Sequence, residues 1–158
     1  MAEKEINTPL MPPKWGIILL GGRGARLGPL TKGVNKHLFP IFDKPMCQVA
    51  IDFMVKNGVK NIVAVVNGKD KHIYEAIFKN TLNGIGEICY VIQDNPSGTA
   101  HAVGLCHKHL SGQAVIAVMW GDNVFQYNLK ETCLEPLDKE GCRIYLTRVN
   151  EPQHYEVV

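Results

Sequence analysis

The residues between positions 20 and 44 combine glycines with basic side chains in a pattern that suits phosphate chemistry. Three glycines directly follow a short apolar run, at Gly21, Gly22 and Gly24. Bare backbone at such positions lets N–H groups approach phosphate oxygens closely. Arg26 can clamp two phosphate oxygens and Lys36 supplies a point charge, while Asp43 is the only acidic residue in this stretch. The pattern predicts a polyphosphate site.

Neither of two standard phosphate loops fits these glycines. In the G-x-G-x-x-G pattern, Gly22 and Gly24 match but Leu27 stands where the third glycine is required. The Walker pattern requires G-K-S or G-K-T after a four-residue gap, and no glycine pair here supplies it. The sequence therefore supports neither a dinucleotide-dependent dehydrogenase nor a P-loop kinase.

A second polar loop, starting at Gln93, follows another apolar run. The Gln93 carboxamide carries a donor and an acceptor, so it can read a pyrimidine edge. Gly98 permits a base to stack on bare backbone, and Thr99 can cap the helix expected after it. By itself, Gln93 is better explained as a surface polar residue at the end of a strand.

A third loop places Asp122 after an apolar run. A carboxylate at this position suits Mg²⁺, which binds one or two protein carboxylates together with phosphate oxygens. The alternative is an Asx-turn that ends the strand.

The elements that must position these loops alternate in type along the chain. Apolar runs predict buried strands at 15–20, 61–66, 87–92 and 114–119, with a fifth at 143–149. Periodic segments predict helices at 46–57, 70–82 (capped by Asp70) and 99–110, and residues 21–45 are expected to form a long loop. This alternation predicts a doubly wound, Rossmann-like α/β domain, with a mostly parallel sheet and helices on both faces. Such folds bind ligands at the carboxyl ends of the strands.

Composition narrows the class of protein. The length of 158 residues predicts one domain, at 15–158, preceded by a flexible arm at 1–14. The net charge of +2 argues against nucleic-acid binding by bulk charge. No apolar run approaches the ~18 residues of a membrane span, and the first residues lack the apolar core of a signal peptide. The five cysteines are widely spaced and odd in number, which favours reduced thiols in a cytoplasmic protein.

The segment GIILLGGRGARLGPLTKGVNKHLFPIFDKPM, at 16–46, resembles the signature of sugar-nucleotide pyrophosphorylases, with the thymidylyltransferase branch closest. The family usually has Thr at the position of Ala25 and Ala at that of Leu20. The resemblance implies a nucleotidyltransferase fold that transfers a nucleoside monophosphate from a nucleoside triphosphate to a sugar 1-phosphate and releases pyrophosphate. It favours dTTP or UTP as the donor.

The same resemblance assigns roles to residues of this chain. Arg26 and Lys36 become catalytic, and Asp122 becomes a ligand of the Mg²⁺ cofactor. The substrate-binding residues become Leu20, Gly21, Gly22, Gly24, Gln93, Gly98 and Thr99. The string GTAHA at 98–102 is closer to uridylyl- and guanylyl-transferring relatives, so the base stays open.

The resemblance ends in the segment that enters the sugar-binding half of the family, where Glu156 replaces the family's Gly. The alternative function is therefore a nucleotide-binding module with little turnover, regulatory or dependent on a partner. Assembly into a homo-oligomer is left open.

Overall fold

The computed structural model describes most of the predicted domain. The described residues are 13–22, 24–81, 83–95, 97–113, 115–125, 141–151 and 153. Most of the predicted arm, Cys133 and Glu156 lie outside these residues.

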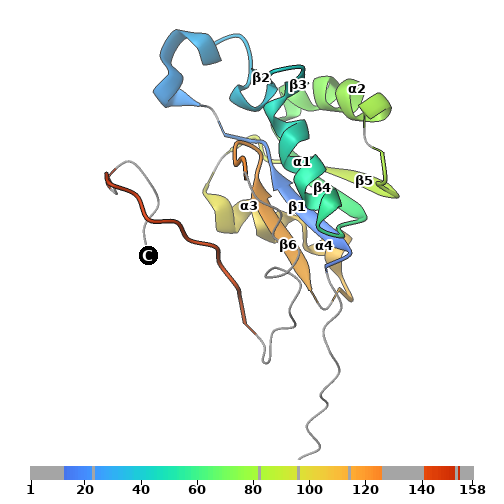
Figure 1. Cartoon of the computed structure of the whole chain (residues 1–158). Coiled ribbons are helices and arrows are strands. Elements are labelled where there is room, and N and C mark those ends of the chain that lie inside the picture. Colours follow the sequence, from blue (N-terminus) through green and yellow to red (C-terminus); the bar gives the residue numbers. More distant parts are fainter. Residues whose placement is uncertain are drawn as a thin grey trace, which may run out of the picture.

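A parallel four-stranded sheet forms the centre of the molecule, in the order β5-β4-β1-β6 (Figure 1). Its strands are β1 (Trp15–Leu19), β4 (Asn61–Val66), β5 (Glu87–Ile92) and β6 (Ile116–Trp120). Residues 62–66 of β4 are all buried, as expected for an apolar strand that is covered on both faces. All four strands lie within two residues of their predicted bounds.

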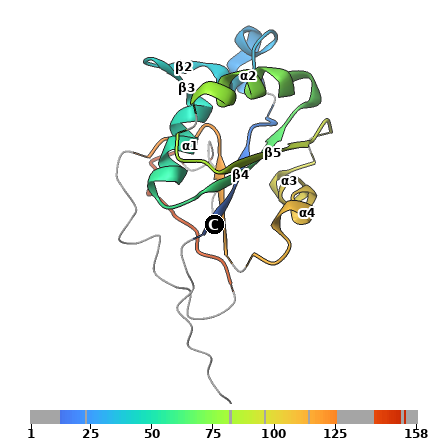
Figure 2. The same cartoon turned by 90° about the vertical axis from the view of Figure 1, so that its right-hand side faces the viewer.

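Helices cover both faces of this sheet, and Figures 1 and 2 show the two layers. One face carries α1 (Met46–Lys56) and α2 (Lys71–Thr81), whose Ile51 and Tyr74 pack in one buried cluster with Ile18. The other carries α3 (Thr99–Leu105) and α4 (His107–Leu110), where Cys106 joins Ile17 in a second cluster. Ile17 and Ile18, consecutive residues of β1, thus point into opposite layers. The predicted doubly wound fold is confirmed.

The connection after β1 has more structure than the sequence predicted. It contains the 3-10 helices η1 (Ala25–Thr31) and η2 (Lys36–Leu38) and an antiparallel pair, β2 (Pro40–Ile41) and β3 (Lys44–Pro45). These elements are too short to leave a periodic pattern. A third 3-10 helix, η3 (Gly68–Asp70), precedes α2.

Three sequence predictions of elements were wrong. The helix expected at 99–110 is broken at Cys106, whose N–H bonds to the carbonyl of Val103 and tightens that turn. Asp70 turns its carboxylate to amide groups of the site described below rather than to α2. Residues 143–149 pair with no described strand. An apolar run alone does not form a strand, because its backbone also needs a neighbouring strand with which to hydrogen-bond.

The described residues contain no helix that is long and apolar enough to cross a membrane. Four of the five cysteines fall within these residues, and all four are free thiols: Cys47, Cys89, Cys106 and Cys142.

Candidate functional site

The loops that carry the predicted site residues begin side by side at one edge of the sheet. Gly21 and Gly121 follow neighbouring strands, and the Gly121 N–H donates to the Leu19 carbonyl at 3.0 Å. On the other side, the N–H of Leu20 donates to Val65 at 2.8 Å, and that of Gln93 donates to Val66 at 2.9 Å. The parallel register therefore brings the ends of β1, β4, β5 and β6 together, as the strand-end rule predicts.

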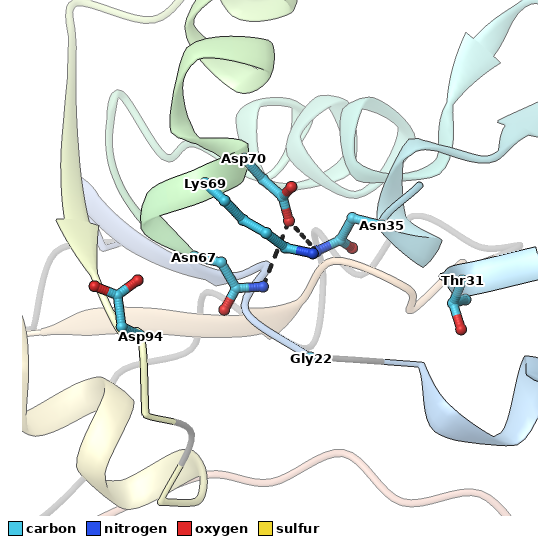
Figure 3. A pocket seen from close by; sticks show the side chains of 7 residues that line it. All are labelled: Gly22, Thr31, Asn35, Asn67, Lys69, Asp70 and Asp94. Carbon is cyan, nitrogen blue, oxygen red and sulfur yellow. Dashed lines mark hydrogen bonds between the residues drawn. The ribbon is translucent and has the colours of Figure 1, made fainter. Parts of the chain in front are cut away.

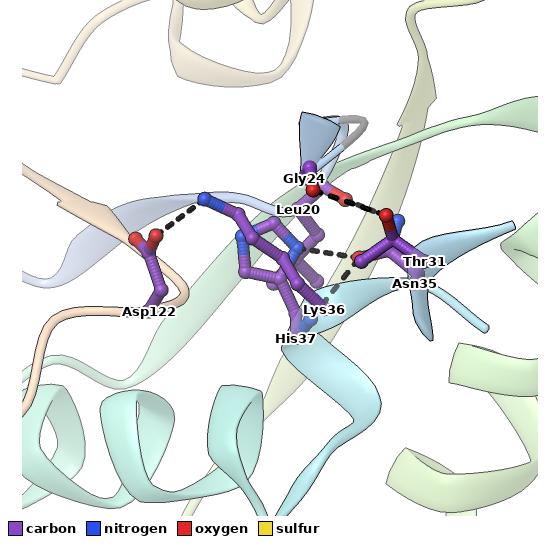
Figure 4. Close-up of polar contacts among 7 residues, drawn as sticks. All are labelled: Leu20, Gly24, Thr31, Asn35, Lys36, His37 and Asp122. Atoms are coloured by element: carbon purple, nitrogen blue, oxygen red, sulfur yellow. Dashed lines mark hydrogen bonds and ion pairs between the residues drawn. The ribbon is translucent and has the colours of Figure 1, made fainter. Parts of the chain in front are cut away.

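The glycines after β1 leave backbone bare between polar side chains. A Cβ at Gly21 would lie 3.4 Å from Gln93 Oε1 and 3.7 Å from Asn67 Oδ1. A Cβ at Gly22 would lie 3.4 Å from the Cε atom of Lys36. Gly24 has a φ of 61° and its carbonyl accepts from the Thr31 hydroxyl at 3.0 Å, which closes the turn (Figure 4). A ligand can thus approach the backbone between amide groups and a cation.

A buried carboxamide ties the basic loop to the sheet. Asn35 donates through Nδ2 to the Leu20 carbonyl at 3.1 Å and to Asp70 Oδ2 at 3.2 Å. Its Oδ1 accepts from the backbone N–H of His37 at 3.1 Å and lies 2.7 Å from the ring Nδ1 atom of His37 (Figure 4). The loop after β1, η3 and η2 are therefore held together by one side chain.

The ring of His37 lies in the interior and is uncharged at neutral pH. Burial, together with the charge of Lys36, lowers the pKa of His37 to about 4. Because Asn35 Nδ2 faces a carbonyl oxygen, Asn35 Oδ1 must accept, so His37 Nδ1 carries the hydrogen. The ring atoms Cε1 and Cδ2 lie 3.7 and 3.1 Å from where a Cβ would stand at Gly22 and Gly121, respectively.

Lys36 and Asp122, two of the predicted functional residues, meet in an ion pair. Lys36 Nζ lies 2.5 Å from Asp122 Oδ2, and both side chains are partly exposed (Figure 4). Partial burial would raise the pKa of Asp122, but the hydrogen bond and charge of Lys36 outweigh it and hold that pKa below its usual value. The structure thus brings the predicted cation and the predicted metal ligand to one point.

The donor set at this point suits a metal ion that keeps most of its ligands outside the protein. Asp122 offers hard carboxylate oxygens, and no group of three or more His, Cys, Asp or Glu that could hold a metal occurs among the described residues. Mg²⁺ commonly binds through one or two carboxylates, with phosphate oxygens and water completing its shell. The residues present fit this mode of Mg²⁺ binding.

Gln93 is buried at the end of β5, where it contacts the helix on the second face. Its Nε2 lies 2.9 Å from His101 Nδ1 and 3.4 Å from the carbonyl oxygen of Gly98. Gly98 has a φ of 94° and precedes α3. Thr99 is the first residue of that helix and no side chain caps it, so the prediction of Thr99 as a cap was wrong.

A cavity of about 430 Å³ opens between the loops after β1, β4 and β5 (Figure 3). It is lined by Gly22, Thr31, Asn35, Asn67, Lys69, Asp70 and Asp94. Of these lining residues, only Gly22 was predicted as a site residue from the sequence. Asn67 directly follows β4, so the strand-end rule could have found it. Asn35 had no such signal, because it lies between basic residues in a segment without periodicity.

Arg26 lies in η1, which follows Gly24 and ends at Thr31. The position of its side chain is outside the described part of the structure. Its predicted role as a phosphate clamp therefore stays a prediction.

Comparison with known proteins places the chain in a family. A family model described as nucleotidyl transferase matches residues 15–158. A glucose-1-phosphate thymidylyltransferase of Xanthomonas campestris pv. campestris is 30% identical over 149 residues, covering 93% of this chain and 50% of that protein. This chain belongs to the nucleotidyl transferase family.

Solved structures agree with this assignment. A crystal structure titled as a putative glucose-1-phosphate thymidylyltransferase from Bacillus anthracis has a TM-score of 0.67 and 32% identity, covering 73% of this chain and 47% of that chain. A UDP-glucose pyrophosphorylase complexed with UDP-glucose has a TM-score of 0.60 and 25% identity, covering 77% of this chain and 52% of that chain. The chain spans about half the length of these relatives.

Replacing Asn35 tests the buried carboxamide. Asn35→Ala removes one hydrogen bond each from the Leu20 carbonyl and the His37 ring, and an unsatisfied buried polar group costs about 1–3 kcal/mol. We expect the free energy of unfolding, measured by urea denaturation, to fall by at least that amount. Asn83→Ala, at an exposed position, is the control and should cost little. Equal small losses in both variants would show that Asn35 does not hold the loop.

The pH dependence of stability tests the state of His37. Between pH 6.5 and about 4 the unfolded chain takes up a proton that the folded ring does not accept, so stability falls as the pH falls through this window. His37→Gln removes the titration, and we expect a shallower slope of the free energy of unfolding over the same range. An unchanged slope would mean that the ring is not buried in its neutral form.

Proposed function

We propose that this chain binds a nucleoside triphosphate together with Mg²⁺, and that it transfers the nucleoside monophosphate to a sugar 1-phosphate with release of pyrophosphate. The observation that carries the proposal is the Lys36–Asp122 pair, which stands beside the bare backbone of Gly22 at the carboxyl edge of the sheet. A phosphate chain at this place would meet a cation, a metal ligand and free backbone together.

The triphosphate is proposed to lie along the loop after β1. Backbone N–H groups near Gly22 and Gly24 suit phosphate oxygens, and Gly24 already has the left-handed conformation that turns the chain there. Lys36 would contribute charge on the same side, and the family resemblance adds the guanidinium of Arg26.

We favour dTTP or UTP as the nucleotide. The support is the carboxamide of Gln93, whose oxygen faces Gly21 and can accept from the N–H of a pyrimidine ring. The names of the relatives agree in part, since one is a thymidylyltransferase and another is complexed with UDP-glucose.

The proposed transfer needs little covalent chemistry from the protein. An oxygen of the sugar phosphate attacks the α-phosphorus in line, and the bond from that phosphorus to the departing pyrophosphate breaks. Mg²⁺, held by Asp122, would supply charge neutralisation on the phosphates. Lys36 and the loop backbone hold the reacting phosphate in place, and positioning of this kind can lower a barrier by about 7–11 kcal/mol.

The proposal includes a cytoplasmic location for the protein. The free thiols of the described cysteines are in keeping with it.

A sedimentation measurement would show whether copies of the chain assemble into a homo-oligomer.

Nucleotide binding is tested by thermal unfolding. A ligand that binds only the native state stabilises it, so dTTP or UTP with Mg²⁺ should raise the melting temperature. ATP should raise it less, because a purine overfills a pyrimidine slot. The absence of a shift with any nucleotide would contradict the proposal. A pyrophosphate-release assay on the same sample distinguishes transfer from the alternative, a nucleotide-binding module without turnover.

The role of Asp122 is tested by a change that keeps its size and removes its charge. Asp122→Asn should abolish the dependence of nucleotide affinity on Mg²⁺, as measured by calorimetry with UTP at several metal concentrations. Asp52→Asn, which breaks the separate Lys44–Asp52 ion pair, is the matched control and should retain the dependence. If both variants respond to Mg²⁺ as the native protein does, Asp122 only ends a strand.

A further inference from the structure

The carboxamide of Gln93 is held in one orientation by its neighbours. Its Nε2 lies 3.4 Å from the carbonyl oxygen of Gly98, and a carbonyl oxygen can only accept a hydrogen bond. The atom that faces it must therefore be the amide nitrogen. The same nitrogen lies 2.9 Å from His101 Nδ1, so this ring nitrogen must accept and the hydrogen of the neutral ring resides on Nε2.

With its nitrogen engaged, Gln93 presents its oxygen to the space above Gly21. Gln93 Oε1 lies 3.4 Å from where a Cβ would stand at Gly21, and it accepts no hydrogen bond from the described residues. The side chain is 6% exposed, so its oxygen is aimed from within the protein. A ligand over Gly21 would meet an acceptor at this point.

A second amide points its oxygen to the same place. Asn67 Nδ2 lies 3.5 Å from the Asp70 carboxylate, which can only accept, so the nitrogen of Asn67 is on that side (Figure 3). Asn67 Oδ1 is then left 3.7 Å from the position of a Cβ at Gly21. Two amide oxygens, one fixed by His101 and one by Asp70, face one patch of bare backbone.

We propose that His101 is a positioning residue, which fixes the Gln93 carboxamide with its oxygen toward Gly21 and so selects nucleobases that carry a hydrogen on the central ring nitrogen of their pairing edge. This inference rests on the proposed function, because it needs a nucleotide over Gly21. Uracil, thymine and guanine carry such a hydrogen, whereas cytosine and adenine present a bare ring nitrogen there. A bare nitrogen would face the oxygens of Gln93 and Asn67 without any hydrogen between them.

Binding of UTP and CTP provides a closely matched test, because the two nucleotides differ only on the pairing edge of the base. We expect native protein with Mg²⁺ to bind UTP about tenfold or more tightly than CTP, in keeping with the cost of an unpaired polar group. In His101→Phe the ring remains but the acceptor at 2.9 Å is lost, so the Gln93 amide is held only by its longer contact of 3.4 Å with the Gly98 carbonyl and turns more readily. The ratio of the two dissociation constants should then fall toward unity, chiefly through tighter binding of CTP.

Two further variants separate orientation from simple packing. In His101→Asn, the side-chain oxygen stands where Nδ1 stood, and the UTP preference should be restored. His109→Phe changes a histidine of α4 that is not among the hydrogen-bond partners of Gln93, and it should leave the ratio unchanged. Circular dichroism and melting temperatures show whether each variant is folded.

The outcomes separate this inference from the function on which it rests. If native protein binds neither nucleotide, both the proposed function and the role of His101 are contradicted. If it binds UTP and CTP equally, or if His101→Phe keeps the full preference or weakens both nucleotides alike, the role of His101 is overturned while nucleotide binding stands.

Discussion

The candidate site depends on one buried carboxamide. The amide nitrogen of Asn35 donates to the carbonyl of Leu20, directly after β1, and to the carboxylate of Asp70. The amide oxygen of Asn35 accepts from His37. Because Asn35 and His37 are both directed inward, the residue between them is directed outward. Lys36 therefore reaches the loop after β6, where it meets Asp122. Without this anchor, a segment of short 3-10 turns would have little to define its path over the sheet.

Charge follows from the same arrangement. The neutral ring of His37 lets a buried residue stand beside Lys36 without adding a second positive charge, and Asp122 balances the cation that is there. The amide groups of Gln93 and Asn67 then supply polarity without charge at the other end of the site. A ligand is therefore expected to place negatively charged phosphates on the β6 side of Gly21 and an uncharged, hydrogen-bonding group on the β5 side. A nucleotide has this arrangement, with phosphates at one end and a base at the other.

The sequence predicted those parts of the fold that depend on local pattern. The apolar runs at 61–66 and 87–92 became β4 and β5 with the predicted bounds. The run of β4 is that of a strand buried on both faces, whereas β5 is an edge strand that is only partly buried. Residues 143–149 also contain several apolar side chains, but strand formation requires a neighbouring strand as well, and the described residues offer none. The break at Cys106 depends on one tight turn, which helical periodicity does not register.

The site was predictable where chemistry follows a strand and hidden where it depends on topology. Gln93 and Asp122 directly follow apolar runs, so a rule about strand ends selected them. Asn35 acquires its importance only when η3 and the end of β1 come together around it, because two of its partners lie 15 and 35 residues away in the sequence. The sequence gives His101 no role of its own, and its contact with Gln93 becomes visible only when α3 packs beside β5.

The central claim is that the loops at the carboxyl edge form one nucleotide site centred on Gly21 and Gly22. A crystal structure of the chain with UTP and Mg²⁺ tests it most directly. We predict the base over Gly21 with its ring N–H on Gln93 Oε1, the phosphates along the loop that follows Gly22, and Lys36 turned from Asp122 toward a phosphate oxygen. A nucleotide bound away from this edge, or bound here with its phosphates beside Gln93, would contradict the account.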